Sequence, residues 1–535
     1  MLILILDLTL STYLYILLIY YKNWKMRLNI LIGGKAGQGI SKVSRIITKT
    51  LVDYGYFIFN YRDYPSIIRG GHNFSVLSIS DKPIASHESK LDGIIALDED
   101  TKKIHKKELK KNSFVIDYKK FINFGINMNI ALSGALMKIL GIKKKILINQ
   151  IEKSLKNKNS FEDSLKAAEY GYNSQSQKYN LKKLKNNISI LSGNKAIAIG
   201  ATNSKIDVYL AYPMTPSTEL LHELASKQNN YIVFQPENEI AVVNMALGAS
   251  FAGAKTMIGT SGGGYDLMTE GLSFQGQSEI PLVVYLGSRP GPATGLPTYT
   301  SQGDLDIALR AGHGEFPRIV ISPGDIIECI EKTNEAFYLS EKHKVLSIIL
   351  SDKHLAENEF SFDRKPNKII NIIVNRKVPG EVIVKASGYE HDKFGNVSED
   401  AELAKKNAEA RMKKYEQIKK ECKKFEMIKI HGNKKSKNLI ISWGSTKGAI
   451  IDAINNLDFK FLQVLYLKPL SNKIKKEILE AKKVILIECN ITGQLGRLIR
   501  EKTGISIKKR ILKYDGRPFR SDELRKELEN NLEDK

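Results

Sequence analysis

Short apolar segments alternate with amphipathic helical stretches and Pro/Gly turns through most of this 535-residue chain. Such alternation is typical of α/β folds, in which helices cover both faces of a largely parallel sheet. At roughly 150 residues per domain, the length predicts about three or four domains. The alternation falls into three stretches, so we expect three doubly wound α/β domains.

Changes in composition give the expected boundaries. Residues 1–25 form an apolar extension, 26–185 the first α/β domain, 186–360 the second, 361–435 a charged connector and 436–535 the third. The first domain opens with a strand at Leu28–Ile32 and a helix at Ser41–Asp53, followed by a strand at Tyr56–Asn60. Later strands are predicted at Ile197–Ile199, Val208–Ala211, Ile232–Phe234, Lys255–Ile258, Leu282–Leu286, Arg318–Ile321, Leu439–Ser442, Phe461–Tyr466 and Val484–Glu488. Residues 400–426 predict a charged connecting helix.

The chain is strongly basic, with 82 Lys and Arg against 58 Asp and Glu. The lysines are scattered without an aromatic-interleaved groove, so we expect no nucleic-acid binding. The three cysteines, Cys329, Cys422 and Cys489, are far apart and form no CxxC pair. They indicate a reducing, cytoplasmic location and cannot supply the four thiolates of an iron–sulfur cluster.

Residues 1–25 allow two interpretations. The run is marginally long for a membrane anchor and Asp7 interrupts it, while Lys22 and Lys25 follow the apolar stretch, where a secretory signal would have basic residues first. Met26 directly precedes the first strand. We therefore prefer a start of the folded protein at this point, which makes membrane attachment doubtful, and keep an anchor as the alternative.

A glycine-rich turn, Gly33 to Gly39, joins the first strand to the first helix. It resembles a P-loop, but Ile40 stands where the phosphate-binding lysine would be. It also lacks the dinucleotide-binding spacing, and the second strand ends at Asn60 instead of an acidic residue. The turn therefore predicts either an anion site or close packing alone. The run Glu390-His391-Asp392 predicts no metal site, because adjacent residues of an extended segment point in alternating directions.

Several motifs follow one another in a fixed order along the chain. The second expected domain contains Tyr212-Pro213-Met214-Thr215-Pro216-Ser217-Thr218-Glu219, Glu237-Asn238-Glu239-Ile240-Ala241, Thr260-Ser261-Gly262-Gly263-Gly264 and Ser288-Arg289-Pro290-Gly291-Pro292-Ala293-Thr294-Gly295-Leu296-Pro297-Thr298. The first contains Ser66-Ile67-Ile68-Arg69-Gly70-Gly71-His72-Asn73, and the C-terminal motifs are Trp443-Gly444-Ser445-Thr446, Glu488-Cys489-Asn490, Gly493-Gln494-Leu495 and Tyr514-Asp515-Gly516-Arg517-Pro518-Phe519. This ordered set resembles the alpha subunit of 2-oxoacid:ferredoxin oxidoreductases of the 2-oxoglutarate type, with a gamma domain fused in front. The run from Ser66 to Asn73 is then the gamma-type motif.

The resemblance implies a gamma-type domain, a thiamine-diphosphate pyrimidine-binding domain and a transketolase C-terminal-like domain. It implies CoA-dependent oxidative decarboxylation of a 2-oxoacid with reduction of ferredoxin. The cofactor is then shared with a beta subunit that holds Mg²⁺ and a [4Fe–4S] cluster, in an alpha-beta or (alpha-beta)2 assembly. This chain has no Gly-Asp-Gly motif with a downstream Asn for the magnesium, the nearest text being Gln302-Gly303-Asp304-Leu305. We therefore expect it to be inactive alone.

For catalysis, the resemblance implies a carboxylate that hydrogen-bonds the aminopyrimidine ring, and Glu239 matches the family's glutamate. Glu237 is the rival assignment, and either carboxylate would otherwise cap the helix that begins near Ile240. Pro213 and Gly262 are the further expected cofactor contacts.

For the substrate, the expected contacts are Thr215 and Arg289, with Thr298 in the following loop. Thr215 ends a strand, where open α/β sheets bind ligands, although it is also suited to cap a helix. Arg289 follows a strand too, and a guanidinium there can pair bidentately with a carboxylate. A surface salt bridge is its plainer interpretation.

Two further points follow from the resemblance. Tyr299 occupies a position where the 2-oxoglutarate group usually has a basic residue, so dicarboxylate selectivity needs another cation, for which we considered Arg310, His313 and Arg318. In the gamma-type motif, coenzyme A contacts are expected at Ser66, Arg69, Gly70 and Gly71, although a structural turn explains the glycines equally well.

The alternative function for the whole chain is a non-catalytic or membrane-tethered subunit with the same fold.

Overall fold

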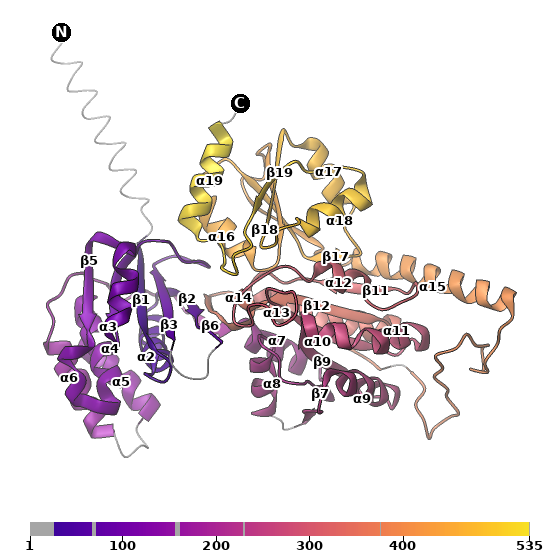
Figure 1. Ribbon diagram of the computed structural model, residues 1–535, viewed down its shortest axis with the longest axis horizontal. Coiled ribbons are helices and arrows are strands. Elements are labelled where there is room, and N and C mark those ends of the chain that lie inside the picture. The colour runs from indigo at the N-terminus through magenta and orange to yellow at the C-terminus, as the bar shows by residue number, and fades with distance from the viewer. Residues whose placement is uncertain (1–25, 67–70, 156–160, 228–229, 375, 534–535) are drawn as a thin grey trace, which may run out of the picture.

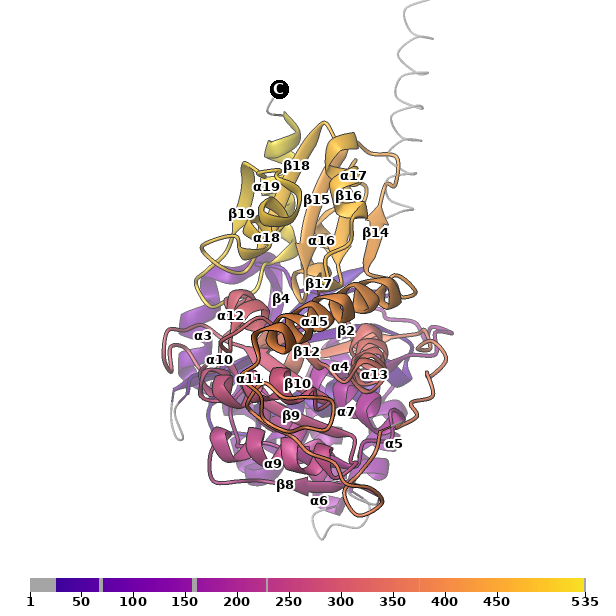
Figure 2. The same cartoon turned by 90° about the vertical axis from the view of Figure 1, so that its right-hand side faces the viewer.

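The computed structural model describes residues 26–66, 71–155, 161–227, 230–374 and 376–533, and shows three β-sheets flanked by helices (Figure 1). This confirms the α/β class. The first unit lies at the left of Figure 1, the second at the lower right and the C-terminal unit above. Figure 2 shows the charged connecting helix α15 (Ala401–Cys422) running along the border between the second and C-terminal units. The expected anchor in residues 1–25 lies outside the described residues.

The first sheet has the order β5-β4-β1-β3-β2-β13-β6. Its strands are β1 (Arg27–Lys35), β2 (Phe57–Asp63), β3 (His72–Ser80), β4 (Leu91–Ala96), β5 (Leu109–Asp117), β6 (Ser189–Ser192) and β13 (Glu359–Phe362). The sheet is mixed, because β1 runs parallel to β4 but antiparallel to β3. Residues 28–34 of β1 are buried throughout, as is typical of a central strand. Its helices are α2 (Ile40–Asp53), α3 (Glu99–His105), α4 (Met128–Ile139), α5 (Lys144–Leu155) and α6 (Phe161–Asn173).

The second sheet has the order β17-β11-β12-β10-β9-β7-β8. Its strands are β7 (Val208–Leu210), β8 (Ile232–Phe234), β9 (Thr256–Ser261), β10 (Leu282–Ser288), β11 (Arg318–Ile321), β12 (Leu346–Asp352) and β17 (Tyr466–Lys468). All pairings are parallel except that of β17 with β11. The carboxyl ends of β7 to β12 therefore lie at one edge. The connecting helices are α7 (Gly193–Asn203), α8 (Thr218–Ala225), α9 (Glu239–Phe251), α10 (Gly262–Leu267), α11 (Thr269–Ser278), α12 (Leu305–Arg310), α13 (Ile326–His343) and α14 (Lys353–Glu357).

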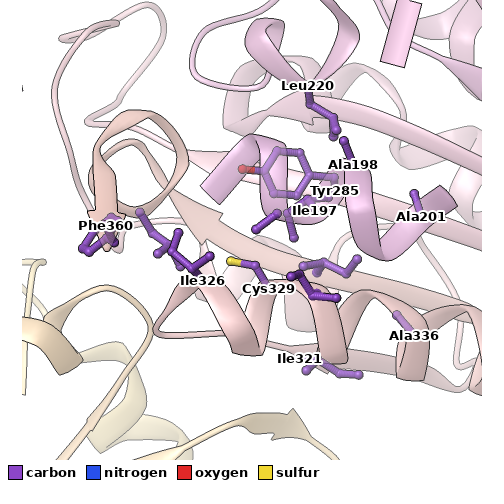
Figure 3. Packing of buried hydrophobic residues seen from close by; sticks show 14 of the residues in the cluster. Ile197, Ala198, Ala201, Leu220, Tyr285, Ile321, Ile326, Cys329, Ala336 and Phe360 are labelled. Atoms are coloured by element: carbon purple, nitrogen blue, oxygen red, sulfur yellow. The ribbon is translucent and has the colours of Figure 1, made fainter. Parts of the chain in front are cut away.

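The strand prediction at Ile197–Ile199 is wrong, because these residues lie within helix α7. The side chain of Ser192 accepts a hydrogen bond from the backbone N–H of Lys195 and caps this helix. Figure 3 shows Ile197 on α7 facing Cys329 of α13. A short apolar run fits a buried strand and a buried helix equally well, and here the preceding cap selects the helix.

The C-terminal sheet has the order β14-β16-β15-β18-β19. Its strands are β14 (Ile428–Gly432), β15 (Asn438–Trp443), β16 (Lys460–Val464), β18 (Lys483–Glu488) and β19 (Lys509–Leu512), with helices α16 (Thr446–Ala453), α17 (Lys473–Glu480), α18 (Gln494–Thr503) and α19 (Ser521–Glu533). The predicted single strand Phe461–Tyr466 is wrong, since β16 ends at Val464 and Tyr466 begins β17 in the second sheet. This short strand joins the C-terminal unit to the sheet that carries the candidate site.

Candidate active site

Four sequence-predicted site residues meet at the carboxyl edge of the second sheet. Thr215 follows β7, Gly262 follows β9 and Arg289 follows β10. Glu239 is the first residue of α9, directly after β8. This edge is where open α/β sheets bind their ligands, and the parallel topology brings together residues separated by up to 74 positions, as in the hydrogen bond from Arg289 to Thr215.

Glu239 is a buried carboxyl group with an unused acceptor. Its side chain is 3% exposed, and among the described residues its Oε1 atom has no hydrogen-bond partner. The helix cap belongs to Asn238, whose side chain accepts from the N–H of Ala241 at 2.9 Å. Glu237 is exposed. Since buried polar atoms almost always have a partner, the geometry favours Glu239 over Glu237 for binding a group that this chain does not contain.

The glycine run after β9 makes room for two carboxyl groups. A Cβ atom on Gly264 would lie 2.6 Å from Oε1 of Glu239, and one on Gly262 would lie 2.7 Å from Oδ2 of Asp304. A Cβ on Gly263 would meet no atom of the described chain within 4 Å. The two flanking glycines are thus required by the carboxyl groups packed against them.

The positive charge of Arg289 is attracted by both carboxyl groups, those of Glu239 and Asp304. Its Nη1 donates to the backbone carbonyl of Thr215 at 2.8 Å. Burial lowers the pKa of the Arg289 guanidinium, and the negative charges of Asp304 and Glu239 act in the opposite direction. Arg289 is partly buried, and the carboxyl groups whose charges act on it, those of Asp304 and Glu239, belong to the site, so the surface salt bridge considered above does not describe it.

Thr215 lies in the turn before α8, whose N-cap is Ser217. Its side chain lines a cavity of about 410 Å³ that also includes Ser41 and Asn73 of the first unit. The helix-capping interpretation of Thr215 is therefore wrong, and the residue faces a space between the first and second units. Pro213 is partly buried in the same turn.

Asp304 is a site residue that the sequence did not reveal. Its carboxylate accepts from the Ser288 hydroxyl at 2.8 Å. Burial raises the pKa of Asp304 to about 6, against the lowering effect of that hydrogen bond and of Arg289. The sequence does contain one signal, the polar run Gln302-Gly303-Asp304 after the loop with Thr298, but we interpreted that run only as lacking the magnesium-binding motif.

The C-terminal unit holds the loop that carries Asp304. The side chain of Gln302 donates to the carbonyl of Trp443 at 2.7 Å and accepts from the N–H of Cys489 at 2.8 Å. The side chain of Gln494 donates to the carbonyl of Gly303 at 2.7 Å. These contacts give a positioning role to three of the C-terminal motifs, because they fix the backbone next to Asp304.

The loop after Arg289 presents Thr298 and Tyr299. Thr298 is buried, and its hydroxyl has no hydrogen-bond partner within the described chain. The Arg517 guanidinium stacks on the Tyr299 ring, with its central carbon 3.8 Å from the ring centroid. The N–H of Thr300 donates to the carbonyl of Gly516 at 3.0 Å. Arg517 of the C-terminal unit therefore brings a guanidinium to Tyr299, the position at which we expected a basic residue.

The three cations that we considered instead lie in other surroundings. Arg310 forms an ion pair with Glu501, while Arg318 is buried and donates to the carbonyl of Ala311 at 2.6 Å. His313 is exposed. Compensation by these three residues is therefore not supported.

In the glycine-rich turn of the first unit, close packing accounts for Gly39. A Cβ on Gly39 would lie 2.2 Å from the amide nitrogen of Asn129, and Gly39 adopts φ +82°. In the predicted CoA motif, Ser66 is exposed and Gly71 has a left-handed φ of 67°. Arg69 and Gly70 lie outside the described residues.

Neither a metal cluster nor a membrane span is found in the described ranges. Groups of three or more potential metal-ligating side chains are absent from them. The Glu390 carboxylate pairs with Arg411, and that of Asp392 accepts from nearby backbone N–H groups. Within the same ranges, none of the helices has the length and apolar character needed to cross a bilayer.

Comparison with known proteins defines the class. Residues 199–427 match a family described as "Pyruvate flavodoxin/ferredoxin oxidoreductase, thiamine diP-bdg", and residues 29–122 match "Pyruvate ferredoxin/flavodoxin oxidoreductase". The fold matches the 2-oxoglutarate:ferredoxin oxidoreductase of Magnetococcus marinus, solved with 2-oxoglutarate, coenzyme A and succinyl-CoA bound, with a TM-score of 0.87 and 25% identity over 95% of this chain and 100% of that chain. The class is therefore that of oxidoreductases acting on 2-oxoacids.

Sequence relatives narrow this class to one subunit type. The 2-oxoacid:ferredoxin oxidoreductase subunit alpha of Saccharolobus solfataricus is 30% identical over 94% of this chain and 97% of its own length. The 2-oxoglutarate synthase subunit KorA of Methanocaldococcus jannaschii is 31% identical over 58% of this chain and 90% of its own length. The chain belongs to the family of 2-oxoacid:ferredoxin oxidoreductase alpha subunits.

Proposed function

We propose that this chain works with a beta subunit to convert a 2-oxoacid, preferentially 2-oxoglutarate, and CoA to acyl-CoA and CO2, with electrons passing to ferredoxin. The observation that carries the proposal is the buried Glu239 carboxyl, whose Oε1 atom has no partner within the described chain. A buried acceptor at the ligand-binding edge of the sheet fits the aminopyrimidine ring of thiamine diphosphate. When bound, this cofactor supplies the carbon nucleophile that attacks the keto group.

Glu239 would hold a proton at the aminopyrimidine ring nitrogen. Its carboxyl group packs against the backbone of Gly264, since a Cβ on that residue would lie 2.6 Å from Oε1 of Glu239. A rigid, desolvated carboxyl hydrogen-bonds more strongly than one in water. Positioned proton transfer of this kind contributes about 10²–10⁴-fold to a rate.

Arg289, Thr215 and Thr298 would bind the carboxylate and keto group of the substrate. A guanidinium pairs with a carboxylate through two parallel hydrogen bonds. The unpaired Thr298 hydroxyl is a donor ready for a substrate oxygen. Pro213 and Gly262 would lie against the cofactor, because both border the same strand ends.

The surface beside Glu239 is suited to a beta subunit. Exposed apolar side chains project from α9 and α10, at Ile240 (51% exposed), Met245 (42%) and Leu267 (53%). Clustered exposed apolar residues mark interaction surfaces. We place the beta subunit here, where it would close the site and contribute Mg²⁺ and the [4Fe–4S] cluster. Ferredoxins are typically acidic, so the net charge of +24 favours their docking.

Coenzyme A would enter between the first and second units. The cavity of about 410 Å³ joins Arg62 and Asn73 of the first unit to Thr215 of the site. Asn73 closes the gamma-type motif, in which we propose CoA contacts at Arg69, Gly70 and Gly71. Ser41, Asn73 and Thr215 give the cavity polar walls, and Arg62 lies there beside the carboxyl groups of Asp63, Glu219 and Glu357. The binding of the CoA phosphates would therefore depend on the gamma-type motif and not on the charge of this cavity.

The preference for a dicarboxylic acid is supported by Arg517. Its side chain is 42% exposed while its guanidinium lies on the Tyr299 ring. The Nε atom lies 3.8 Å from Asp63 Oδ2, too far for a strong hydrogen bond. Its Nη1 atom donates to the carbonyl of Asp515 at 3.2 Å, so the other N–H groups of this guanidinium are the donors that we propose for the second carboxylate of 2-oxoglutarate.

The test is CoA-dependent viologen reduction by the chain co-purified with its beta subunit. We expect activity with 2-oxoglutarate, and a loss of about 10²–10⁴-fold in kcat for Glu239→Gln with assembly intact. Glu237→Gln is the matched control and should retain the wild-type rate, because Glu237 is exposed. Wild-type turnover in Glu239→Gln, or a loss confined to Glu237→Gln, would overturn the assignment.

A further inference from the structure

Asp304 is placed to balance the positive charge of Arg289. Its carboxylate is fixed by the Ser288 hydroxyl at 2.8 Å and packs against Gly262. Ser288 is the last residue of β10, so the next residue along the chain is Arg289. The Arg289 guanidinium and the Asp304 carboxylate attract one another.

The loop before Asp304 is held firmly in place. Gln302 is fully buried, and its backbone N–H donates to the carbonyl of Cys489 at 2.7 Å. The side chain of Asn490 donates to the carbonyl of Gln302 at 3.1 Å. Because these contacts come from another unit of the fold, the position of the backbone next to Asp304 is set by the assembled protein.

We propose that Asp304 is the resident counter-charge of Arg289, and that it takes up a proton when the carboxylate of a 2-oxoacid binds there. The inference rests on the proposed function, since it needs Arg289 to bind the substrate carboxylate. No bond other than the O–H bond of Asp304 forms or breaks, and the proton comes from solvent. Asp304 acts through Arg289 and is therefore a positioning residue.

The electrostatics of the site give the direction of the effect. The charged groups that face Asp304 are Arg289 and Asp266, and Glu239 faces Arg289 from α9. An incoming carboxylate adds a negative charge, which raises the pKa of Asp304 above the value of about 6 that it has without substrate. Between that pH and the raised pKa of the substrate-bound state, substrate binding is accompanied by proton uptake, so affinity falls as pH rises. The limit is about tenfold per pH unit for a one-proton linkage.

The experiment is the pH profile of KM and kcat for the 2-oxoacid in the co-purified complex. We expect KM of the wild type to rise up to about tenfold per pH unit above about pH 6, with kcat not following the same profile. Asp304→Asn keeps the shape and the hydrogen bond to Ser288 but cannot ionise, so its KM should not rise with pH. Ser288→Ala removes a hydrogen bond that lowers the pKa of Asp304, so its break point should move to higher pH.

Asp306→Asn is the matched control. Asp306 lies two residues further on, where its carboxylate pairs with Arg310 and Arg497 at the surface. It should keep the wild-type profile. A slope in Asp304→Asn equal to that of the wild type, a wild-type KM independent of pH, or an unmoved break point in Ser288→Ala would each refute the inference. Absence of 2-oxoacid turnover in the wild-type complex would instead refute the proposed function.

Discussion

Substitution of Gly264 by Ala tests whether the glycine run is required by the carboxyl groups beside it. The added Cβ would lie 2.2 Å from Oγ1 of Thr260 and 2.6 Å from Oε1 of Glu239. Ordinary contact begins at 3.4 Å, so the Glu239 oxygen would have to move by about 0.8 Å. Overpacking of this kind costs about 1–3 kcal/mol of folding free energy. A misplacement of about 1 Å at a reacting group costs about 10²-fold in rate.

The assay combines urea unfolding of the chain with viologen reduction by the complex. We expect Gly264→Ala to lower both the free energy of unfolding and kcat by these amounts. Gly263→Ala is the stability control, because its Cβ would meet no described atom within 4 Å. It should raise stability by about 0.5–1 kcal/mol, as alanine does for glycine in a helix. Equal stability and equal rates in Gly264→Ala and the wild type would refute the packing argument.

Two further predictions concern the contacts of the C-terminal unit. Lys447→Met leaves the Asp325 and Glu328 carboxylates without the ammonium that pairs with both, and should cost about 3–5 kcal/mol in urea unfolding. Although burial alone would raise the pKa of Asp325, Lys447 holds this pKa below the ordinary value. The stabilisation by the ion pair is therefore present above about pH 4 and is lost as pH falls further. An unchanged free energy of unfolding in Lys447→Met at pH 7 would contradict the account. Arg517→Gln should lower kcat/KM for 2-oxoglutarate by about 10–100-fold, the value of a charge-assisted hydrogen bond, with little effect on 2-oxobutyrate. Arg520→Gln, on the same loop and paired with a surface glutamate, is its control, and an equal fall for both acids would refute the specificity role.

The sequence predicted those parts of the fold that depend on local patterns. Runs such as Arg318–Ile321 and Ile232–Phe234 are strands with the predicted bounds, because apolar β-branched segments between turns indicate strands. Ile197–Ile199 failed because a run of three apolar residues carries no periodicity. The helix that carries these residues, α7, also packs closely against α13, since a Cβ on Gly200 would lie 2.6 Å from the Cβ of Thr333.

The site was predictable only where a motif marked it. Thr215, Glu239 and Arg289 lie in motifs, and the parallel sheet brings their strand ends together. Asp304 and Arg517 could not be predicted in the same way, because their importance comes from contacts between distant parts of the chain. Asp304 faces Gly262 after another strand, and Arg517 reaches its ring partner from the C-terminal unit.

The position of the aminopyrimidine ring is the most direct test of the central claim. The measurement is a structure of the complex with its beta subunit and thiamine diphosphate. We predict that the Glu239 carboxyl lies within about 2.6–3.2 Å of a ring nitrogen, the range of a functional hydrogen bond. A ring bound elsewhere, with the Glu239 oxygen still unpaired, would contradict the account.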